Sequence, residues 1–214
     1  MTDLGRNPAG RLSVAERLRA LRREVPPDVG IVAVTKGRSI EECRAALAAG
    51  LHDLGENRVQ EALPKMEALP EARWHLIGHL QTNKARHAAR FHMIQSIDSL
   101  RVAEAVARQA GRKAALLEVN VSGEASKSGC APDEAVALAA AADGLLELRG
   151  LMCVGALAGD PTPGFLLLRQ LREQAQERLG KLLPVLSMGM TDDWRQALAA
   201  GSSMLRLGRA LFDQ

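Results

Sequence analysis

The stretch Ile31-Val32-Ala33-Val34-Thr35-Lys36 decides the fold, because it reads as a strand buried on both faces that ends in a lysine. Nearly continuous apolar strands of this kind belong to parallel sheets that are covered on both sides. Comparable runs recur along the chain, and helical patterns lie between them. With the first run they number eight, at residues 31–35, 51–54, 74–77, 92–96, 115–121, 148–154, 185–187 and 204–207. Alternation at this spacing predicts parallel strands joined by right-handed crossovers.

Helix-start signals support the alternation. Ser13-x-x-Glu16 and Ser39-x-x-Glu42 are capping boxes that each open an apolar period, so one helix is expected before the first strand. Pro64 falls inside the apolar pattern at residues 59–69, which predicts that this helix is kinked or starts late. Three later helices are expected to open at Asp98-Ser99, at Pro132 to Glu134 and at Thr162-Pro163.

Eight repeats favour a closed barrel over an open, doubly wound sheet. About 23 residues per repeat is compact for a (β/α)8 barrel but lies within its known range. The turn after the first strand, Thr35-Lys36-Gly37-Arg38-Ser39, contains neither the glycine fingerprint of dinucleotide-binding sheets nor a P-loop. We therefore predict an α/β protein with a single domain over residues 1–214. It is a (β/α)8 TIM barrel with an extra N-terminal helix and a loose segment at residues 1–10.

Composition excludes several classes of protein. The chain has 214 residues, a net charge of +3 and no apolar run near the roughly 18–20 residues that span a bilayer, so a membrane protein is not expected. The N-terminus lacks a hydrophobic signal core and the 3 cysteines are widely separated, which predicts a protein of the reducing cytoplasm. Aromatic residues make up only 2% and tyrosine is absent. A base-stacking platform for nucleic acid is therefore not expected, and the scattered arginines are interpreted as solvated surface.

Barrels of this type carry their chemistry at the carboxyl ends of the strands, where Lys36 stands out. Burial at a strand end favours the neutral amine, which attacks an aldehyde to form a Schiff base. The alternative is a lysine that only extends to solvent. Ser187 and Gly189, and Gly208 before a short helix at Arg209–Phe212, suit an anion such as phosphate. A lysine opposite a phosphate site predicts a phosphorylated aldehyde, of which pyridoxal 5′-phosphate (PLP) is the common one.

At these residues the sequence resembles a known family. Seven motifs occur in order, at residues 31–36 (IVAVTK), 55–61 (GENRVQE), 74–84 (WHLIGHLQTNK), 122–129 (SGEASKSG), 150–152 (GLM), 186–190 (LSMGM) and 206–208 (RLG). They resemble the PLP homeostasis proteins of the YggS/PROSC type, and the resemblance extends from Val14 to Phe212. The family has a single barrel like the N-terminal domain of alanine racemase.

The resemblance implies how a cofactor ring would be held. Lys36 carries PLP as an internal aldimine, Asn57 lies beside the ring, and Arg206 faces the pyridine nitrogen. A permanently charged guanidinium at that nitrogen disfavours its protonation, which restrains carbanion chemistry. Two of the departures from the family lie near these residues. Arg58 stands where tyrosine is common, and the stretch Gly37-Arg38-Ser39 stands where Thr-x-Pro is frequent.

The resemblance also implies a phosphate site. Ser187 and the backbone of Met188, Gly208 and Arg209 would hold the phosphate. Arg209 departs from the family, which usually has serine or threonine there. A hydroxyl contact is therefore lost, while the backbone N–H remains.

Other polar residues receive structural interpretations. His75 and His79 are four apart but share no helical face and have no third ligand nearby, so no metal site is predicted. Lys127 is interpreted as a solvated loop lysine, with a lysine that reaches the mouth of the barrel as the alternative. The acids expected at helix N-termini are Asp98, Asp192 and Asp193.

The sequence therefore predicts a PLP-binding protein that takes part in intracellular PLP (vitamin B6) homeostasis without robust catalysis of its own. PLP-dependent apo-enzymes are the expected recipients, and a monomer is expected. The main competing hypothesis is a weakly active PLP-dependent amino-acid racemase. The related racemase takes its second base, a tyrosine, from another domain and a partner subunit, and this chain has no tyrosine. Two further hypotheses are a Schiff-base aldolase, a class that usually places its lysine on a later strand, and a nucleic-acid-binding protein.

Overall fold

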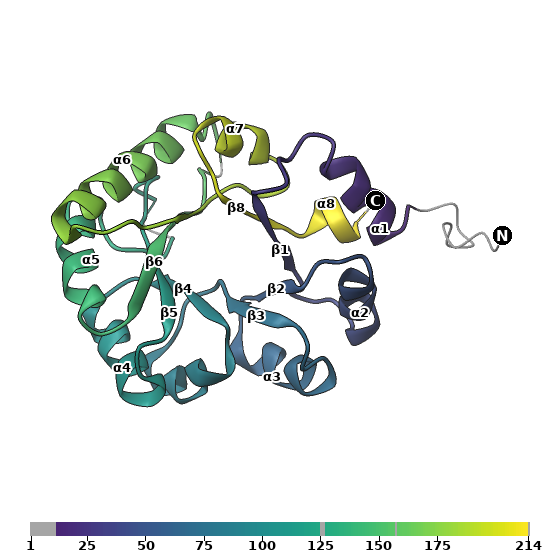
Figure 1. The fold of residues 1–214 in the computed structure, drawn as a ribbon, viewed down its shortest axis with the longest axis horizontal. Coiled ribbons are helices and arrows are strands. Elements are labelled where there is room, and N and C mark those ends of the chain that lie inside the picture. The colour runs from purple at the N-terminus through teal and green to yellow at the C-terminus, as the bar shows by residue number, and fades with distance from the viewer. Residues whose placement is uncertain (1–11, 125–126, 157, 214) are drawn as a thin grey trace.

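The structure of the protein is a computed structural model that describes residues 12–124, 127–156 and 158–213. Within these residues, parallel strands close into a barrel in chain order, and β1 pairs with both β2 and β8 (Figure 1). The strands are β1 (Gly30–Val34), β2 (Asp53–Glu56), β3 (Arg73–Leu76), β4 (Met93–Ile97), β5 (Ala114–Glu118), β6 (Glu147–Met152), β7 (Val185–Ser187) and β8 (Met204–Leu207). The predicted (β/α)8 barrel is confirmed.

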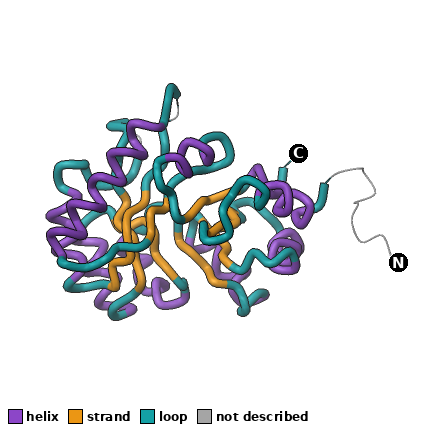
Figure 2. The backbone as a smooth tube through the Cα atoms, turned by 45° about the horizontal axis from the view of Figure 1, so that its top comes forward, coloured by secondary structure: helices purple, strands orange, loops and turns teal. Residues whose placement is uncertain are grey.

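Helices surround the barrel, and Figure 2 shows them in purple around the orange strands. They are α1 (Val14–Leu21), α2 (Ile40–Ala48), α3 (Val59–Ala68), the 3-10 helix η1 (Thr82–Arg90), α4 (Leu100–Ala110), α5 (Ala135–Asp143), α6 (Thr162–Leu179), α7 (Trp194–Ala199) and α8 (Arg209–Phe212). The extra N-terminal helix is confirmed, because α1 precedes β1 and packs against α2 and α8. The loose segment expected at residues 1–10 lies outside the described residues, and the extent of the single domain stays a prediction.

The capping boxes at the first two helices are confirmed. Ser13 Oγ accepts from the Glu16 N–H, and Ser39 Oγ accepts from the Glu42 N–H. Each glutamate carboxylate accepts in return from its serine N–H at 2.8 Å. These reciprocal bonds satisfy amide groups that a helix start otherwise leaves without partners, so the local sequence alone is enough to place both helices.

Several strand and helix bounds differ from those expected from the sequence. The second strand begins later than the predicted 51–54, at Asp53. Helix α3 begins at Val59 and continues through Pro64, so the proline does not delay it. Helix α5 begins at Ala135, and the residues expected in its first turn, Pro132 to Glu134, form the turn before it.

Side-chain alternation along the strands separates two environments. Ile31 and Ala33 of β1 belong to the main apolar core, together with residues of the surrounding helices. A separate small cluster of Met93, Leu116 and Met152 comes from strands alone and fills part of the barrel interior. Successive side chains of a strand point to opposite faces, so Val32, which lies between Ile31 and Ala33, faces the barrel interior.

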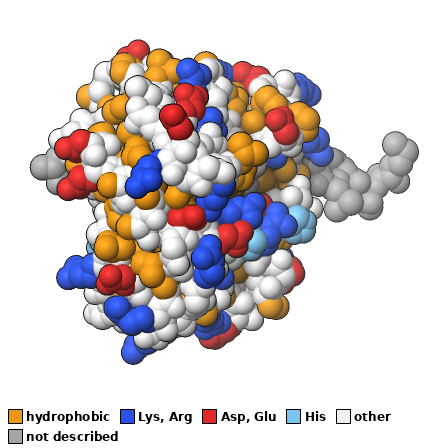
Figure 3. All heavy atoms as spheres, turned by 60° about the vertical axis from the view of Figure 1, so that its left-hand side comes forward, with side chains coloured by type: hydrophobic (Ala, Val, Ile, Leu, Met, Phe, Trp, Pro, Cys, Tyr) orange, Lys and Arg blue, Asp and Glu red, His pale blue; other side chains and the backbone are white. Residues whose placement is uncertain are grey.

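Charged side chains of both signs are mixed on the face shown in Figure 3. Blue and red spheres are scattered over this face with apolar atoms between them, and several blue ones gather right of the centre. This distribution agrees with the interpretation of the arginines as solvated surface. Within the described part of the chain, no helix has the length and apolar character needed to cross a membrane.

A buried ion pair ties the end of β1 to α3. Lys65 Nζ donates to Glu56 Oε1 at 2.6 Å and to the Thr35 carbonyl at 2.7 Å, and Thr35 Oγ1 also donates to Glu56 Oε1. Glu56 is fully buried and Lys65 is nearly so. Because Thr35 immediately precedes Lys36, this pair fixes the backbone from which Lys36 extends.

We expect Lys65→Met to lower the free energy of unfolding by roughly 3–5 kcal/mol, because it leaves the Glu56 carboxylate buried without a cation. The matched Glu56→Leu/Lys65→Met double variant should recover most of the loss, since it removes both buried charges. Urea denaturation of the three proteins measures the effect. A double variant that is less stable than the single variant would contradict this account.

Candidate functional site

A cavity of about 540 Å³ opens at the carboxyl ends of the strands. Lys36 lines it from the end of β1, and Arg206 and Gly208 line it from β8 and its end. Side-chain alternation explains why these residues line the cavity, because Lys36 follows Val34 by two positions and Gly208 follows Arg206 by two, so each pair lies on one face of its strand. The structure thus brings together Lys36, Arg206, Gly208 and Arg209 of the residues predicted from sequence.

Lys36 is exposed on the cavity wall. The expectation that burial of its strand would shield the amine is therefore wrong for this structure. The side chain has no ion-pair partner among the described residues. This leaves a primary amine that can meet a ligand in the cavity without first breaking a salt bridge.

Arg206 is a buried cation at the same cavity, only 3% exposed. Its Nη1 donates to the Ser187 carbonyl and to Ser187 Oγ, both at 2.8 Å, and Nη2 donates to the Cys153 carbonyl at 2.7 Å. Burial lowers the pKa of the guanidinium, although a group that begins so high stays charged at neutral pH. The three bonds hold the planar group in one orientation.

Ser187 and Met188 do not line this cavity. Ser187 is fully buried, and its hydroxyl donates to Gln95 Oε1 while it accepts from Arg206. The Met188 N–H donates to the Met204 carbonyl, and the Met188 side chain packs in the main core. The Ser187 hydroxyl and the Met188 N–H are therefore already engaged in supporting the strands and Arg206.

The start of α8 and the loop after β7 form another part of the cavity wall. Arg209 pairs with Asp192, and both side chains line the cavity. Thr191 Oγ1 accepts from the Ala210 N–H at 3.2 Å, which ties the loop to α8. Asp193 accepts from the Met190 N–H at 2.6 Å. Asp192 thus acts as an ion-pair partner across the cavity, which the interpretation as a helix N-terminal acid missed.

Asn57 lines a neighbouring cavity of about 410 Å³, together with Arg58, His79 and Lys84. A Cβ at Gly78 would lie only 2.4 Å from the Asn57 carbonyl oxygen, so only glycine allows the two loops this close approach. Asn57 and Lys36 therefore lie on different cavities in this structure.

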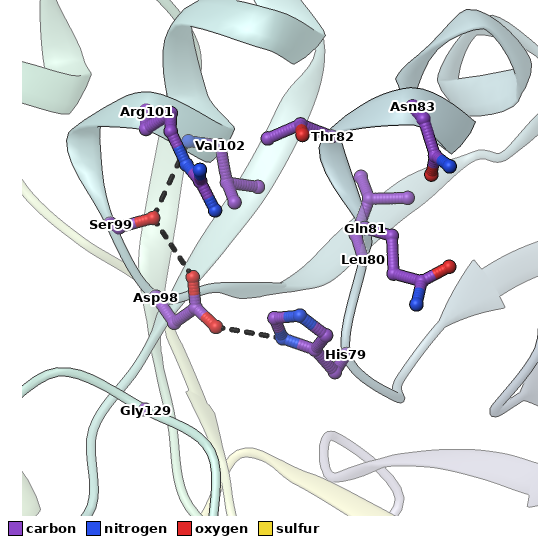
Figure 4. A pocket seen from close by; sticks show the side chains of 10 residues that line it. All are labelled: His79, Leu80, Gln81, Thr82, Asn83, Asp98, Ser99, Arg101, Val102 and Gly129. Atoms are coloured by element: carbon purple, nitrogen blue, oxygen red, sulfur yellow. Dashed lines mark hydrogen bonds and ion pairs between the residues drawn. The ribbon is translucent and has the colours of Figure 1, made fainter.

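A third cavity, of about 610 Å³, lies between the loops that follow β3 and β4. Figure 4 shows the His79 ring turned toward Asp98, with Nδ1 2.9 Å from Oδ2. Asp98 also accepts from Ser99 Oγ, which caps α4. His75 has different partners, and within the described residues no group of three or more metal-ligating side chains comes together.

The chain matches the family model described as alanine racemase, N-terminal domain, over residues 12–213. It is 42% identical to the pyridoxal phosphate homeostasis protein of Pseudomonas aeruginosa, over 93% of this chain and 90% of that protein. The chain belongs to the pyridoxal phosphate homeostasis protein family. The family predicted from the seven motifs is thereby confirmed.

Solved structures agree with this membership. PipY of Synechococcus elongatus PCC7942, with PLP bound, superimposes with a TM-score of 0.86 at 36% identity and covers 94% of this chain and 100% of that one. An alanine racemase from Corynebacterium glutamicum gives a TM-score of 0.78 at 16% identity, over 93% of this chain and 60% of that one. The second likeness is one of fold, which bears out the alanine racemase-like barrel.

Lys127 differs from the solvated lysine that its place in a loop predicts. Its Nζ donates to Glu124 Oε1 at 2.7 Å and to the Gly155 carbonyl at 2.6 Å, and its side chain is only 11% exposed. The interpretation as a solvated loop lysine is wrong. Lys127 instead links the loop after β5 to the end of β6, where Gly155 lines the Lys36 cavity.

Sequence reasoning missed Glu118 and Thr191. Glu118, at the end of β5, is 5% exposed, and its Oε2 has no hydrogen-bond partner among the described residues. Burial raises the pKa of its carboxyl to about 7, although the nearby charge of Arg206 lowers it. The sequence signal for Glu118 was a carboxylate inside the apolar run at residues 115–121. For Thr191 the signal was its place directly after the 186–190 motif.

We expect the contribution of Glu118 to stability to fall as the pH rises from about 4.5 to about 7, because folded Glu118 keeps a proton that the unfolded chain has lost. Glu118→Gln removes this term. It should leave stability unchanged near pH 4 and raise it by roughly 3 kcal/mol at pH 8. Denaturant unfolding of both proteins across this range measures the difference. The control is Glu67→Gln, at a side chain that is 69% exposed. A stability difference for Glu118→Gln that does not change with pH would contradict the assignment.

Proposed function

We propose that this chain binds PLP in the Lys36 cavity and takes part in intracellular PLP homeostasis without robust catalysis of its own. The observation that carries the proposal is the meeting of a primary amine, Lys36, and a buried cation, Arg206, on one cavity wall. Relatives that are named for PLP homeostasis, and the PipY structure with PLP bound, support it.

The residues of the cavity fit such a cofactor. A volume of about 540 Å³ is ample for one small ligand. Basic groups dominate the end formed by β8 and α8, where Arg206 and Arg209 suit an anionic, nitrogen-containing ring compound. At Gly155 a Cβ would lie 2.5 Å from Asp193 Oδ2, so glycine allows the Asp193 carboxyl to approach this part of the wall closely.

When bound, PLP supplies an aldehyde carbon that reacts with a primary amine. Lys36 would supply that amine, and the backbone at Gly208 and Arg209 would hold the phosphate. Arg206 would place a permanent positive charge near the ring nitrogen, where it would disfavour protonation. This arrangement holds the cofactor but weakens it as an electron sink.

The position of Arg206 also argues against an efficient racemase. Racemisation needs a second base on the face of the substrate opposite Lys36. The chain contains no tyrosine for that role. We therefore propose at most weak racemase-like activity, and rapid racemisation of alanine by the purified, PLP-loaded protein would contradict the proposal.

The proposal also covers the recipients of PLP, the oligomeric state and the cellular compartment. PLP-dependent apo-enzymes are the proposed recipients, and the protein is proposed to act as a monomer in the cytoplasm. Cys43, Cys130 and Cys153 are all buried and free of disulfides, which supports a reducing compartment.

Lys36→Ala should abolish the visible absorption band that PLP gives with the unaltered protein, because Lys36 is the one lysine among the described residues that line this cavity. Borohydride reduction followed by peptide mapping should place the PLP adduct on Lys36. Lys181→Ala is the control, since Lys181 pairs with Asp143 elsewhere on the surface. An adduct spread over several lysines, or an unchanged band in Lys36→Ala, would overturn the proposed site.

Asp192→Asn should tighten PLP binding by roughly two- to tenfold, because it frees Arg209 and removes a negative charge from the phosphate end. Pyridoxal, which lacks the phosphate, should bind equally well to both proteins. Titration followed by absorbance gives the two dissociation constants, with Asp143→Asn as the surface control. Equal changes for both ligands would show that Arg209 does not meet the phosphate.

A further inference from the structure

A continuous chain of hydrogen bonds crosses the barrel interior from Arg206 to the start of β2. Arg206 Nη1 donates to Ser187 Oγ at 2.8 Å, and Ser187 Oγ donates to Gln95 Oε1 at 2.7 Å. Gln95 Nε2 lies 3.0 Å from His75 Nδ1, and His75 Nε2 lies 2.9 Å from Asp53 Oδ1. The first four residues are at most 3% exposed. A buried polar chain is costly unless every member is paired, and here every link is made.

The carboxylate of Asp53, at the β2 end of the chain, determines which atom donates in every hydrogen bond. Arg73 donates to both Asp53 oxygens, at 2.8 and 2.7 Å. Burial raises the pKa of Asp53, but the bonds from Arg73 and His75 outweigh it and hold that pKa well below its usual range. An ionised carboxylate only accepts, so the proton of a neutral His75 ring lies on Nε2 and Nδ1 carries the lone pair.

The remaining links follow from that tautomer. Gln95 must turn its amide NH2 toward His75 Nδ1 and its carbonyl oxygen toward Ser187. The Ser187 hydroxyl then gives its proton to Gln95 and keeps its lone pairs for Arg206. Met204 Sδ, 3.3 Å from Gln95 Nε2, and the ring of His92 against His75 complete the surroundings of the chain.

We propose that Gln95 and His75 are positioning residues, which orient the Ser187 hydroxyl so that it accepts from Arg206 and holds the guanidinium on the cavity wall. The inference rests on the proposed function, in which Arg206 meets the ring nitrogen of PLP. Neither Gln95 nor His75 lines the Lys36 cavity, so both act through Ser187. Asp53 thereby influences the cofactor end from the opposite end of the barrel.

The test compares substitutions that keep or lose one acceptor. Gln95→Leu and His75→Leu break the chain and leave the Ser187 hydroxyl free to rotate. His75→Asn keeps an acceptor, the Asn Oδ1, close to the position of Nδ1. Both His75 variants lose the bond to Asp53, so a purely structural role predicts similar effects from the two. Ser203→Ala removes the acceptor of the Leu186 N–H, next to the hydrogen-bond chain, without removing any bond within that chain, and so is the control for lost stability alone.

We expect Gln95→Leu and His75→Leu to weaken PLP binding at least tenfold and to shift the absorption maximum of the bound cofactor. His75→Asn and Ser203→Ala should stay within about twofold of the unaltered protein and keep its maximum. Unchanged affinity and spectrum in both leucine variants would overturn the positioning role while leaving the proposed function intact. Failure of the unaltered protein to bind PLP would overturn the proposed function itself.

The tautomer gives a second measurement that requires neither a variant nor a ligand. Nitrogen-15 chemical shifts of the His75 ring in the unaltered protein should show Nε2 protonated and Nδ1 bare. A proton on Nδ1 would reverse the direction of the chain and overturn the inference, even if the leucine variants fail to fold.

Discussion

A permanent positive charge inside the barrel is the constraint on which the rest of the site depends. Arg206 projects inward from β8 and is almost completely buried, so it is tolerable only if its donors are satisfied. Ser187 and the Cys153 carbonyl, at the ends of neighbouring strands, supply the acceptors. The Ser187 hydroxyl needs a partner in turn, which accounts for the buried amide of Gln95 in a barrel interior that also contains apolar side chains such as Leu116.

Around this cation, different loops at the mouth of the barrel contribute different groups to the site. The end of β1 presents Lys36 on a backbone that the buried Glu56–Lys65 pair secures from outside the barrel. The loop after β7 and the start of α8 present a basic group whose charge Asp192 moderates. The resulting site combines a free amine with a fixed cation. That combination suits holding PLP and opposes its use as an electron sink.

Much of this was predictable because the decisive signals are local. The β7 and β8 strands, the two capping boxes and the place of Lys36 at the end of β1 follow from short apolar runs and from three-residue spacing. The roles of Ser187 and Lys127 were not predictable, because they depend on partners 92 and 28 positions away in the sequence. The exposure of Lys36 could not be predicted for a similar reason. Burial of a strand does not determine the environment of the residue that follows it, which depends on loops contributed by other repeats.

A crystal structure of the protein grown with PLP would test the central claim most directly. The account predicts that PLP occupies the Lys36 cavity, linked to Lys36 Nζ, with its ring nitrogen within hydrogen-bond distance of the Arg206 guanidinium and its phosphate at the start of α8. PLP bound elsewhere, for example in the cavity of His79 and Asp98, with Lys36 and Arg206 untouched, would contradict it.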